Sequence, residues 1–332
     1  MPPTISVVIP TYNRCRSLQR CLDSLRGQAD APLFEVVVVD DGCTDGTREM
    51  LAAYTAPFPL RWIASERGGP GAARNLGVAS AQAPLVLFLD DDCEADARLL
   101  SRHAAAHRTI ERAVIIGPMV RPARGRRRSW VLWEQEVLDK QYRAMMEGLY
   151  QPTPRQFYTA NASMSRAEFL DAGGFDSAFK RAEDVEFGYR LWDAGVRFAF
   201  HPGAVVTHYA ERSLAAWWKV PYQYGIYDVR MWRDKGRRGM LDLIRHEFPK
   251  RNSLLRSVVR FAAGHERRSR AVAGAALAVA AATGEMGVFR IARPCYSVAF
   301  NLMYYQGVAE ELGTDAIFRS LIGGRAVDIT PP

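Results

Sequence analysis

Short runs of β-branched and other apolar residues recur through the first third of the chain and alternate with stretches of helical spacing. The runs are Ile5–Ile9, Glu35–Val39 and Leu85–Leu89, with weaker ones at Leu60–Ala64 and Val114–Ile116. A near-continuous apolar run of this length is typical of a strand that is buried on both faces. Regular alternation of such strands with helices predicts an α/β fold, in which helices cover both faces of a mostly parallel sheet.

The pattern changes at Pro118 and again near Ser213. Between these points strand and helix signals are mixed, and beyond Ser213 the strand signals fade. Four helices are predicted there: Ala215–Lys235, Leu254–Ala263, Ser269–Ala282 and Tyr296–Leu312. We therefore expect one α/β domain over residues 1–212, with halves 1–117 and 118–212, followed by a helical C-terminal extension over 213–332.

The composition is that of a globular protein with a basic balance. Hydrophobic residues make up 48% and charged residues 24%, and 44 Lys and Arg against 36 Asp and Glu give a net charge of +8. A basic protein suits an anionic partner, such as a nucleoside diphosphate, an anionic lipid surface, an acidic glycan or nucleic acid. Nucleic acid is not expected, because no recognised nucleic-acid-binding motif accompanies the charge.

The cysteines and the apolar segments indicate a cytoplasmic protein. Five scattered cysteines, with no CxxC pair, argue against a disulfide framework or a zinc cluster and fit a reducing compartment. The N-terminus lacks the basic start and long apolar stretch of a signal peptide. The most apolar later run, Ala271–Thr283, is shorter than the roughly 20 residues that span a bilayer. We expect a soluble protein that at most contacts the inner face of the cell membrane peripherally.

Polar segments follow four of the predicted strands, at the edge of the sheet where α/β proteins bind ligands. They are Pro10–Arg14, Asp40–Gly42, Glu66–Asn75 and Asp90–Asp92. A single Asp after a strand usually caps a helix or stabilises a turn. Four polar strand ends at one edge of a sheet instead indicate a ligand site.

Asp90, Asp91 and Asp92 are the sharpest of these signals. Successive strand residues point to opposite faces, so Asp90 and Asp92 can lean the same way. Two carboxylates beside a buried strand are costly without a counterion, and a divalent cation that also binds substrate phosphates removes that cost. His208, which follows the strand-like run Ala204–Thr207, could complete the set of ligands. The alternatives are a solvated acidic turn and a structural histidine.

A glycine-rich turn, Gly68–Gly71, precedes a predicted helix and offers backbone amides to a phosphate or a sugar. It is neither the GxGxxG of dinucleotide enzymes, which would follow the first strand, nor a Walker sequence. Arg74 lies one turn into that helix, where it could reach a diphosphate or hold an acidic residue. The alternative is a surface arginine.

Glu183 and Asp184 open another predicted helix, soon after the turn Gly173–Asp176. Carboxylates at a helix N-terminus gain about 0.3–1 kcal/mol from the helix dipole, so capping alone could explain the pair. In the functional interpretation one of them is a general base. Such a base removes the proton of an attacking hydroxyl, while a metal takes up the charge of a leaving diphosphate.

Taken in order, these motifs resemble glycosyltransferase family 2, an inverting family with the GT-A fold. The motifs are Pro10–Arg14, Val39–Thr47, Gly71–Asn75, Phe88–Asp92, Gly173–Asp176 and Glu183-Asp184, within a similarity that spans about Thr4 to Tyr209. Cys43 departs from the serine that is more usual at its position, and the helical extension lies outside the similarity. The resemblance implies transfer of a sugar from a nucleoside-diphosphate sugar, with a UDP-sugar favoured, and Mn²⁺ or Mg²⁺ as the cofactor.

The resemblance also implies roles for individual residues. Asp184 would be the catalytic base, and Glu183 would hold it or bind the acceptor. Asp90, Asp92 and His208 would bind the metal. Residues 1–117 would form the nucleotide-binding half and residues 118–212 the acceptor side. The residues expected to contact the nucleotide sugar are Pro10, Thr11, Tyr12, Arg14, Asp40, Asp41, Gly71, Arg74, Asp90 and Asp91.

Two other classes of protein stay open as alternatives. A nucleotidyltransferase acting on a sugar phosphate would carry a Gly-rich, basic loop after the first strand, which Pro10–Arg14 is not. A non-catalytic sugar-nucleotide-binding protein would have no need of Glu183-Asp184 beside a metal motif. The stretch after Asp184 lacks the QxxRW segment of processive membrane synthases, which favours a non-processive enzyme. Its acceptor would be a glycan, a lipid-linked glycan or a small metabolite.

Basic and aromatic residues outside these motifs indicate further partners. Five arginines precede Trp130 and Trp133: Arg121, Arg124, Arg126, Arg127 and Arg128. They suit an anionic membrane or a lipid-diphosphate acceptor, or else a solvated loop over the active site. The aromatic residues of the C-terminal helices suit a helical core or a homo-oligomer interface, and some of them could stack on acceptor sugars.

Overall fold

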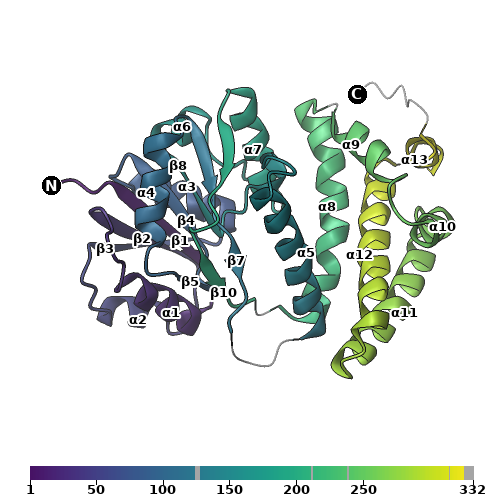
Figure 1. Cartoon of the computed structure of the whole chain (residues 1–332), viewed down its shortest axis with the longest axis horizontal. Helices are drawn as coiled ribbons and strands as arrows, with labels where there is room; N and C mark the ends of the chain where they lie inside the picture. The colour runs from purple at the N-terminus through teal and green to yellow at the C-terminus, as the bar shows by residue number, and fades with distance from the viewer. Residues whose placement is uncertain (124–127, 211, 238, 314, 325–332) are drawn as a thin grey trace. The chain divides into compact units, whose positions relative to one another are not determined.

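The computed structural model describes residues 1–123, 128–210, 212–237, 239–313 and 315–324 (Figure 1). The chain divides into two compact units. The first comprises Met1–Gly125 with Val137–Ala210, and the second comprises Arg126–Glu136 with Glu211–Pro332. Arg124, Arg126 and Arg127 of the predicted basic segment lie outside the described residues.

The first unit is built on a seven-stranded sheet with the order β3-β2-β1-β4-β8-β6-β9. Its strands are β1 (Ile5–Thr11), β2 (Phe34–Asp41), β3 (Leu60–Ser65), β4 (Leu85–Leu89), β6 (Ala113–Ile116), β8 (Asn161–Ser165) and β9 (Arg197–Phe200). Strands β1 to β4 run parallel, β8 is antiparallel to β4 and β6, and β9 is parallel to β6. The predicted α/β fold with a mostly parallel sheet is confirmed, and the five strands expected in the first third each lie within an observed strand.

Apolar cores on both faces of this sheet explain its continuous apolar strands. The helices of the first unit are α1 (Cys15–Leu25), α2 (Thr47–Ala53), α3 (Pro70–Ser80), α4 (Leu99–Thr109), α6 (Arg166–Asp171) and α7 (Glu183–Asp193). Because alternate strand residues face opposite sides, Ile9 of β1 packs in one core with Leu18 of α1, while Val8 packs in the other with Val78 of α3. The polar residues Thr11, Asp40 and Asp41 lie at the carboxyl ends of β1 and β2, where the candidate site lies.

A second, three-stranded sheet brings distant parts of the first unit together. It has the order β5-β10-β7, formed by β5 (Cys93–Ala95), β10 (Val206–His208) and β7 (Met119–Val120). β10 runs antiparallel to β5, with His208 opposite Cys93, and parallel to β7. Of these strands, β10 overlaps the strand-like run Ala204–Thr207 of the sequence, whereas β5 and β7 were not predicted. This pairing sets His208 beside the end of the acidic run.

The second unit is helical, which confirms the predicted C-terminal helical region. It contains α8 (Leu214–Lys235), α9 (Gly239–Glu247), α10 (Ser253–Ala262), α11 (Glu266–Glu285), α12 (Phe289–Glu311) and α13 (Asp315–Ile322), and the start of α5 (Ser129–Met146) belongs to it. The helices α9 and α13 were not predicted, and α12 begins earlier than expected because it continues through Pro294. Among the described residues, no helix combines the length and the apolar character that crossing a bilayer requires.

Aromatic side chains fill much of the core of this unit. The ring of Trp133 in α5 lies 5.8 Å from that of Trp217 in α8 and 5.4 Å from that of Phe300 in α12. Trp217 is fully buried. The guanidinium of Arg128 lies 5.8 Å from the ring centroid of Trp130. The tryptophans that accompany the basic segment are therefore part of a folded unit.

Two glycines allow α8 and α12 to approach closely. A Cβ on Gly225 of α8 would lie 2.1 Å from the carbonyl oxygen of Tyr304, and one on Gly307 of α12 would lie 2.1 Å from that of Tyr222. Both neighbours are backbone atoms, which cannot rotate away. The contact between the two helices therefore requires residues without a side chain.

Gly307→Ala is expected to destabilise the second unit by about 1–3 kcal/mol, because the added methyl group overpacks a backbone contact. Thermal and urea unfolding measure the effect. Gly274→Ala in α11 is the matched control, since its Cβ would lie 3.7 Å from Trp218 and alanine favours a helix by up to about 1 kcal/mol. Equal stability of the two variants would contradict the close packing of α8 on α12.

Candidate active site

The ends of β1 and β4 meet through direct contacts between side chains. Thr11 Oγ1 donates a hydrogen bond to Asp91 Oδ2 at 2.7 Å, and Arg14 Nη1 donates to Asp91 Oδ1 at 3.1 Å and also to Asp92 Oδ2. The two strands are parallel neighbours, so their carboxyl ends lie side by side. Four of the residues singled out from the sequence therefore form one cluster.

The two carboxylates at the end of β2 are buried and already engaged. Asp40 accepts hydrogen bonds from the Cys43 amide and from Arg48 Nε. Burial raises the pKa of Asp40, but these hydrogen bonds outweigh it and leave the pKa below its usual value. Asp41 accepts from the amides of Gly68 at 2.7 Å and Gly69 at 3.0 Å. Both side chains thus shape the loops around the site, and Asp41 fixes the glycine turn.

Pro10, near the end of β1, and Tyr12, directly after this strand, are both half-buried at the edge of the site. The Arg67 guanidinium lies 4.0 Å from the centroid of the Tyr12 ring and donates to its hydroxyl at 3.0 Å. Asn13 adopts a φ of 52°, and its side-chain oxygen accepts from the Thr44 amide at 2.7 Å. Sequence reasoning missed Arg67 and the bridging role of Asn13. Asparagine tolerates left-handed backbone, so an Asn at a strand end is a signal that could have found it.

Arg74 joins the two acidic constellations of the sequence. This buried side chain donates from Nη2 to Asp90 Oδ1 at 2.7 Å and from Nη1 to Glu183 Oε1 at 3.2 Å. Of the roles considered from the sequence, Arg74 therefore holds acidic residues and is not a surface arginine. It makes the end of β4 and the start of α7 parts of one site.

Small and amide side chains let α3 and α7 approach each other. A Cβ on Gly71 would lie 3.3 Å from both Glu183 Cγ and Phe175 Cβ. One turn along α3, Asn75 donates to the carbonyl of Phe175 and accepts from its amide, both at 2.8 Å. The turn that precedes α7 is thereby fixed to α3.

The carboxyl group of Asp184 has the properties of a proton acceptor near neutral pH. Burial and the neighbouring carboxylate of Glu183 raise the pKa of Asp184 to about 7, against the opposing effect of Arg74. Its Oδ1 accepts from the Val185 amide at 2.8 Å. A general base is most effective when its pKa is close to the working pH.

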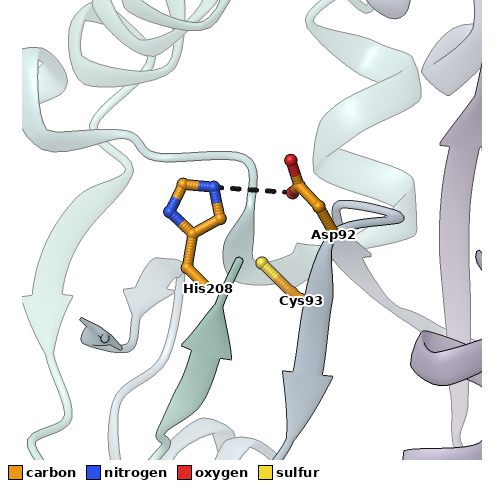
Figure 2. Close-up of side chains that lie close together, drawn as sticks. All are labelled: Asp92, Cys93 and His208. Carbon is orange, nitrogen blue, oxygen red and sulfur yellow. Dashed lines mark ion pairs between the residues drawn. The ribbon is translucent and has the colours of Figure 1, made fainter. Parts of the chain in front are cut away.

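Asp92, Cys93 and His208 point toward one another (Figure 2). His208 Nε2 lies 3.5 Å from Asp92 Oδ1, and this oxygen is buried without a hydrogen-bond partner among the described residues. Burial raises the pKa of the Cys93 thiol well above its usual value, and a protonated thiol is a poor metal ligand. An unsatisfied carboxylate oxygen facing an imidazole nitrogen fits a divalent cation, with those two atoms as ligands.

Asp90 lies outside this group, which differs from the expected geometry. The sequence argument placed Asp90 and Asp92 on one side of a strand, but all three aspartates follow β4 in a turn. In that turn one oxygen of Asp90 binds Arg74, whereas Asp92 faces His208. The alternation argument was therefore wrong for these residues.

Comparison with known proteins identifies the family. The sequence model described as "Glycosyl transferase family 2" matches residues 6–173. The chain belongs to glycosyltransferase family 2. The chain is 35% identical over 222 residues to the validoxylamine A glucosyltransferase of Streptomyces hygroscopicus subsp. limoneus, in an alignment that covers 58% of the chain and 49% of that relative.

Two further comparisons agree with this assignment. The pre-mycofactocin glycosyltransferase of Mycobacterium tuberculosis is 29% identical over 225 residues, covering 64% of the chain and 44% of the relative. The chain thus spans about half the length of these curated relatives. The mannosyltransferase PcManGT of Pyrobaculum calidifontis, in complex with GDP-Man and Mn²⁺, superposes with a TM-score of 0.61 at 20% identity, over 94% of this chain and 88% of that one. This likeness confirms the GT-A type of fold.

Arg74→Met is expected to lower the free energy of unfolding of the protein by about 3–5 kcal/mol, because it leaves the Glu183 carboxylate buried without its cation. Urea unfolding followed by circular dichroism checks this. The control is Arg112→Met, whose exposed pair with Glu168 is worth at most about 1 kcal/mol. If both variants lost a similar free energy of unfolding, the buried ion pairs of Arg74 would not be important for stability.

Proposed function

We propose that this glycosyltransferase moves a sugar from a nucleoside-diphosphate sugar to an acceptor hydroxyl, with inversion at the anomeric carbon and with a divalent cation. One observation carries the proposal: a single buried arginine, Arg74, links the end of β4, where Asp92 has an unsatisfied oxygen, to the start of α7, where Asp184 has a near-neutral pKa. A place for the leaving diphosphate and a place for the attacking hydroxyl are thereby fixed to each other.

Asp92 and His208 would hold the cation, Mn²⁺ or Mg²⁺, and Asp90 has a second carboxylate oxygen that could reach the cation or the donor. The cation would offset the charge that develops on the diphosphate as the sugar departs. A nitrogen ligand favours Mn²⁺ over Mg²⁺, which prefers oxygen. The presence of Mn²⁺ in the PcManGT complex supports this choice.

Asp184 would take the proton of the acceptor hydroxyl as its oxygen attacks the anomeric carbon. One displacement from the face opposite the diphosphate inverts that carbon, so a single base suffices. Glu183, held by Arg74 at 3.2 Å, would keep the start of α7 in place and raise the pKa of the base beside it. Loss of the proton from Asp184 above pH 7 would then switch the base on.

The donor and the acceptor are proposed as classes. The half-buried Pro10 and Tyr12 offer a surface for the nucleotide base, and the amides at the start of α3, near Gly71, suit the diphosphate. A UDP-sugar is the favoured donor, and GDP-mannose, bound by PcManGT, is the competing candidate. The acceptor would be a glycan, a lipid-linked glycan or a small metabolite.

The division of labour along the chain is likewise proposed. Residues 1–212 would form the catalytic domain, with nucleotide binding in 1–117 and acceptor binding in 118–212, and residues 213–332 would form the extension. The change of compact unit near residue 210 supports this boundary. Residues 126–136 are assigned to the second unit, so the first part of α5 would belong with the extension.

Removal of the proposed metal ligands should abolish the metal dependence of nucleotide binding. We expect Mn²⁺ to strengthen binding of UDP to the native chain, and His208→Ala and Asp92→Asn to reduce this gain about 10-fold or more. Isothermal titration of UDP with and without Mn²⁺ measures it. Asp96→Asn, a half-exposed aspartate of the same loop region, is the control and should keep the gain. If a chelator changed neither UDP binding nor turnover, the proposed metal site would be wrong.

Asp184→Asn should lower kcat by roughly 10²–10⁴-fold and leave UDP affinity within about 2-fold of the native value. In the native enzyme kcat should rise with pH and level off above about 7, because the carboxylate form of Asp184 is the active one. The rise should be absent from the residual activity of the variant. Asp193→Asn, at the other end of α7, is the control. A variant that keeps the native rate would require a different base.

A further inference from the structure

A cavity of about 390 Å³ lies within the second unit, among the helices α8, α11 and α12. Figure 1 shows α12 between the other two helices. The glycine contacts described above draw α8 onto α12, and Met303 of α12 forms part of the cavity wall. The cavity is open to solvent.

Aromatic side chains from one face of α8 line the cavity. Trp218 and Tyr222 are one turn apart on that face and are partly exposed, and Tyr227 lies deeper. On α11, a Cβ added to Gly274 would lie 3.7 Å from Trp218 Cη2, so α11 packs against the edge of this ring.

Cations complete the lining. Lys219, Arg230 and Arg270 border the cavity, and no Asp or Glu of the described chain is among its lining residues. Arg230 Nε binds Glu311 at 3.1 Å, and Arg270 Nη2 binds Glu266 at 2.8 Å, which fixes each guanidinium and leaves other N–H groups for a ligand. Lys219 forms no ion pair with any residue that the structure describes.

The charge of the whole chain is concentrated in the part that contains this cavity. Residues 211–332 carry 19 Lys and Arg against 11 Asp and Glu, whereas residues 1–210 carry 25 of each. The net charge of +8 therefore lies entirely beyond residue 210. An anionic ligand would be attracted to this region and not to the first 210 residues as a whole.

We propose that this cavity binds an anionic saccharide, a sugar ring that bears a phosphate or a carboxylate group, at a site separate from the candidate active site. The apolar C–H face of a sugar ring packs on Trp and Tyr rings, and Arg and Lys bind the anionic group. A volume of about 390 Å³ accommodates one or two sugar rings. A small inorganic anion as the ligand would leave the aromatic lining unexplained. A neutral apolar ligand would leave the three cationic side chains unexplained.

The choice of a saccharide rests on the proposed function, because a glycosyltransferase meets saccharides as acceptors and products. The site would retain an acidic acceptor between encounters with the donor. Binding is measured without turnover, so loss of transfer activity in Asp184→Asn would leave this proposal untouched. Failure of saccharide binding would in turn leave the proposed transfer reaction standing.

The test uses the full chain with UDP and Mn²⁺ in excess, so that the candidate active site is filled. Glucose 6-phosphate is the probe, and glucose and inorganic phosphate are its separate halves, all followed by isothermal titration or saturation-transfer NMR. We expect glucose 6-phosphate to bind at least 10-fold more tightly than either half. Lys219→Ala, Arg270→Ala and Trp218→Ala should each weaken its binding at least 5-fold.

Arg267→Ala is the matched control, since this exposed arginine of α11 does not line the cavity. It should bind the probe as the native chain does. Lys219 and Arg270 are exposed, so their variants keep the fold even if Trp218→Ala does not. Equal binding by the Lys219, Arg270 and Arg267 variants would overturn the proposal. Two other results would also overturn it. One is that inorganic phosphate binds as tightly as glucose 6-phosphate, and the other is that the probe no longer binds when UDP and Mn²⁺ are added.

Discussion

The candidate active site depends on the buried guanidinium of Arg74. It joins Asp90, at the end of β4, to Glu183, at the start of α7, and these carboxylates would repel each other without a cation between them. Arg14 has a similar place between the other two aspartates of the acidic run. The two arginines offset part of the negative charge of the four carboxylates that they contact. Asp92 Oδ1 has no hydrogen-bond partner among the described residues, and this oxygen is the atom that suits an added cation.

The sequence predicts this edge of the sheet because parallel strands place their carboxyl ends together, so polar residues after β1, β2 and β4 had to be neighbours. It does not predict which carboxylate pairs with which cation. The contact between Arg74 and Glu183 spans 109 residues, and Gly71 leaves little room for a side chain where Glu183 packs against α3. The place of His208 beside Asp92 depends on the pairing of β10 with β5, a three-residue strand that the sequence did not predict.

The helices of the second unit could be predicted from the sequence, but the way in which they pack and the cavity that they form could not. Its helices have readable apolar spacing, whereas the close approach of α8 and α12 depends on Gly225 and Gly307, which look in sequence like ordinary helix-weakening residues. For the aromatic residues of these helices the sequence left a core, a homo-oligomer interface and stacking on sugars open, and the structure places them differently. Trp217 is buried in the core, and Trp218, the next residue, faces a cavity. Only the packing of three helices decides between these two positions.

The raised pKa of Asp184 is not what helix capping alone would produce, and it supports the role of general base proposed for this residue. A carboxylate that only caps a helix gains about 0.3–1 kcal/mol in its ionised form, which would lower its pKa by less than one unit. Burial can raise the pKa of a carboxyl group by several units, and the adjacent Glu183 adds to this effect. In this protein the effect of burial on the pKa of Asp184 is the larger one, since that pKa lies near 7 despite the helix N-terminus and Arg74. A group placed only to stabilise α7 would be held in its charged form, whereas a pKa near 7 is what the proposed general base requires.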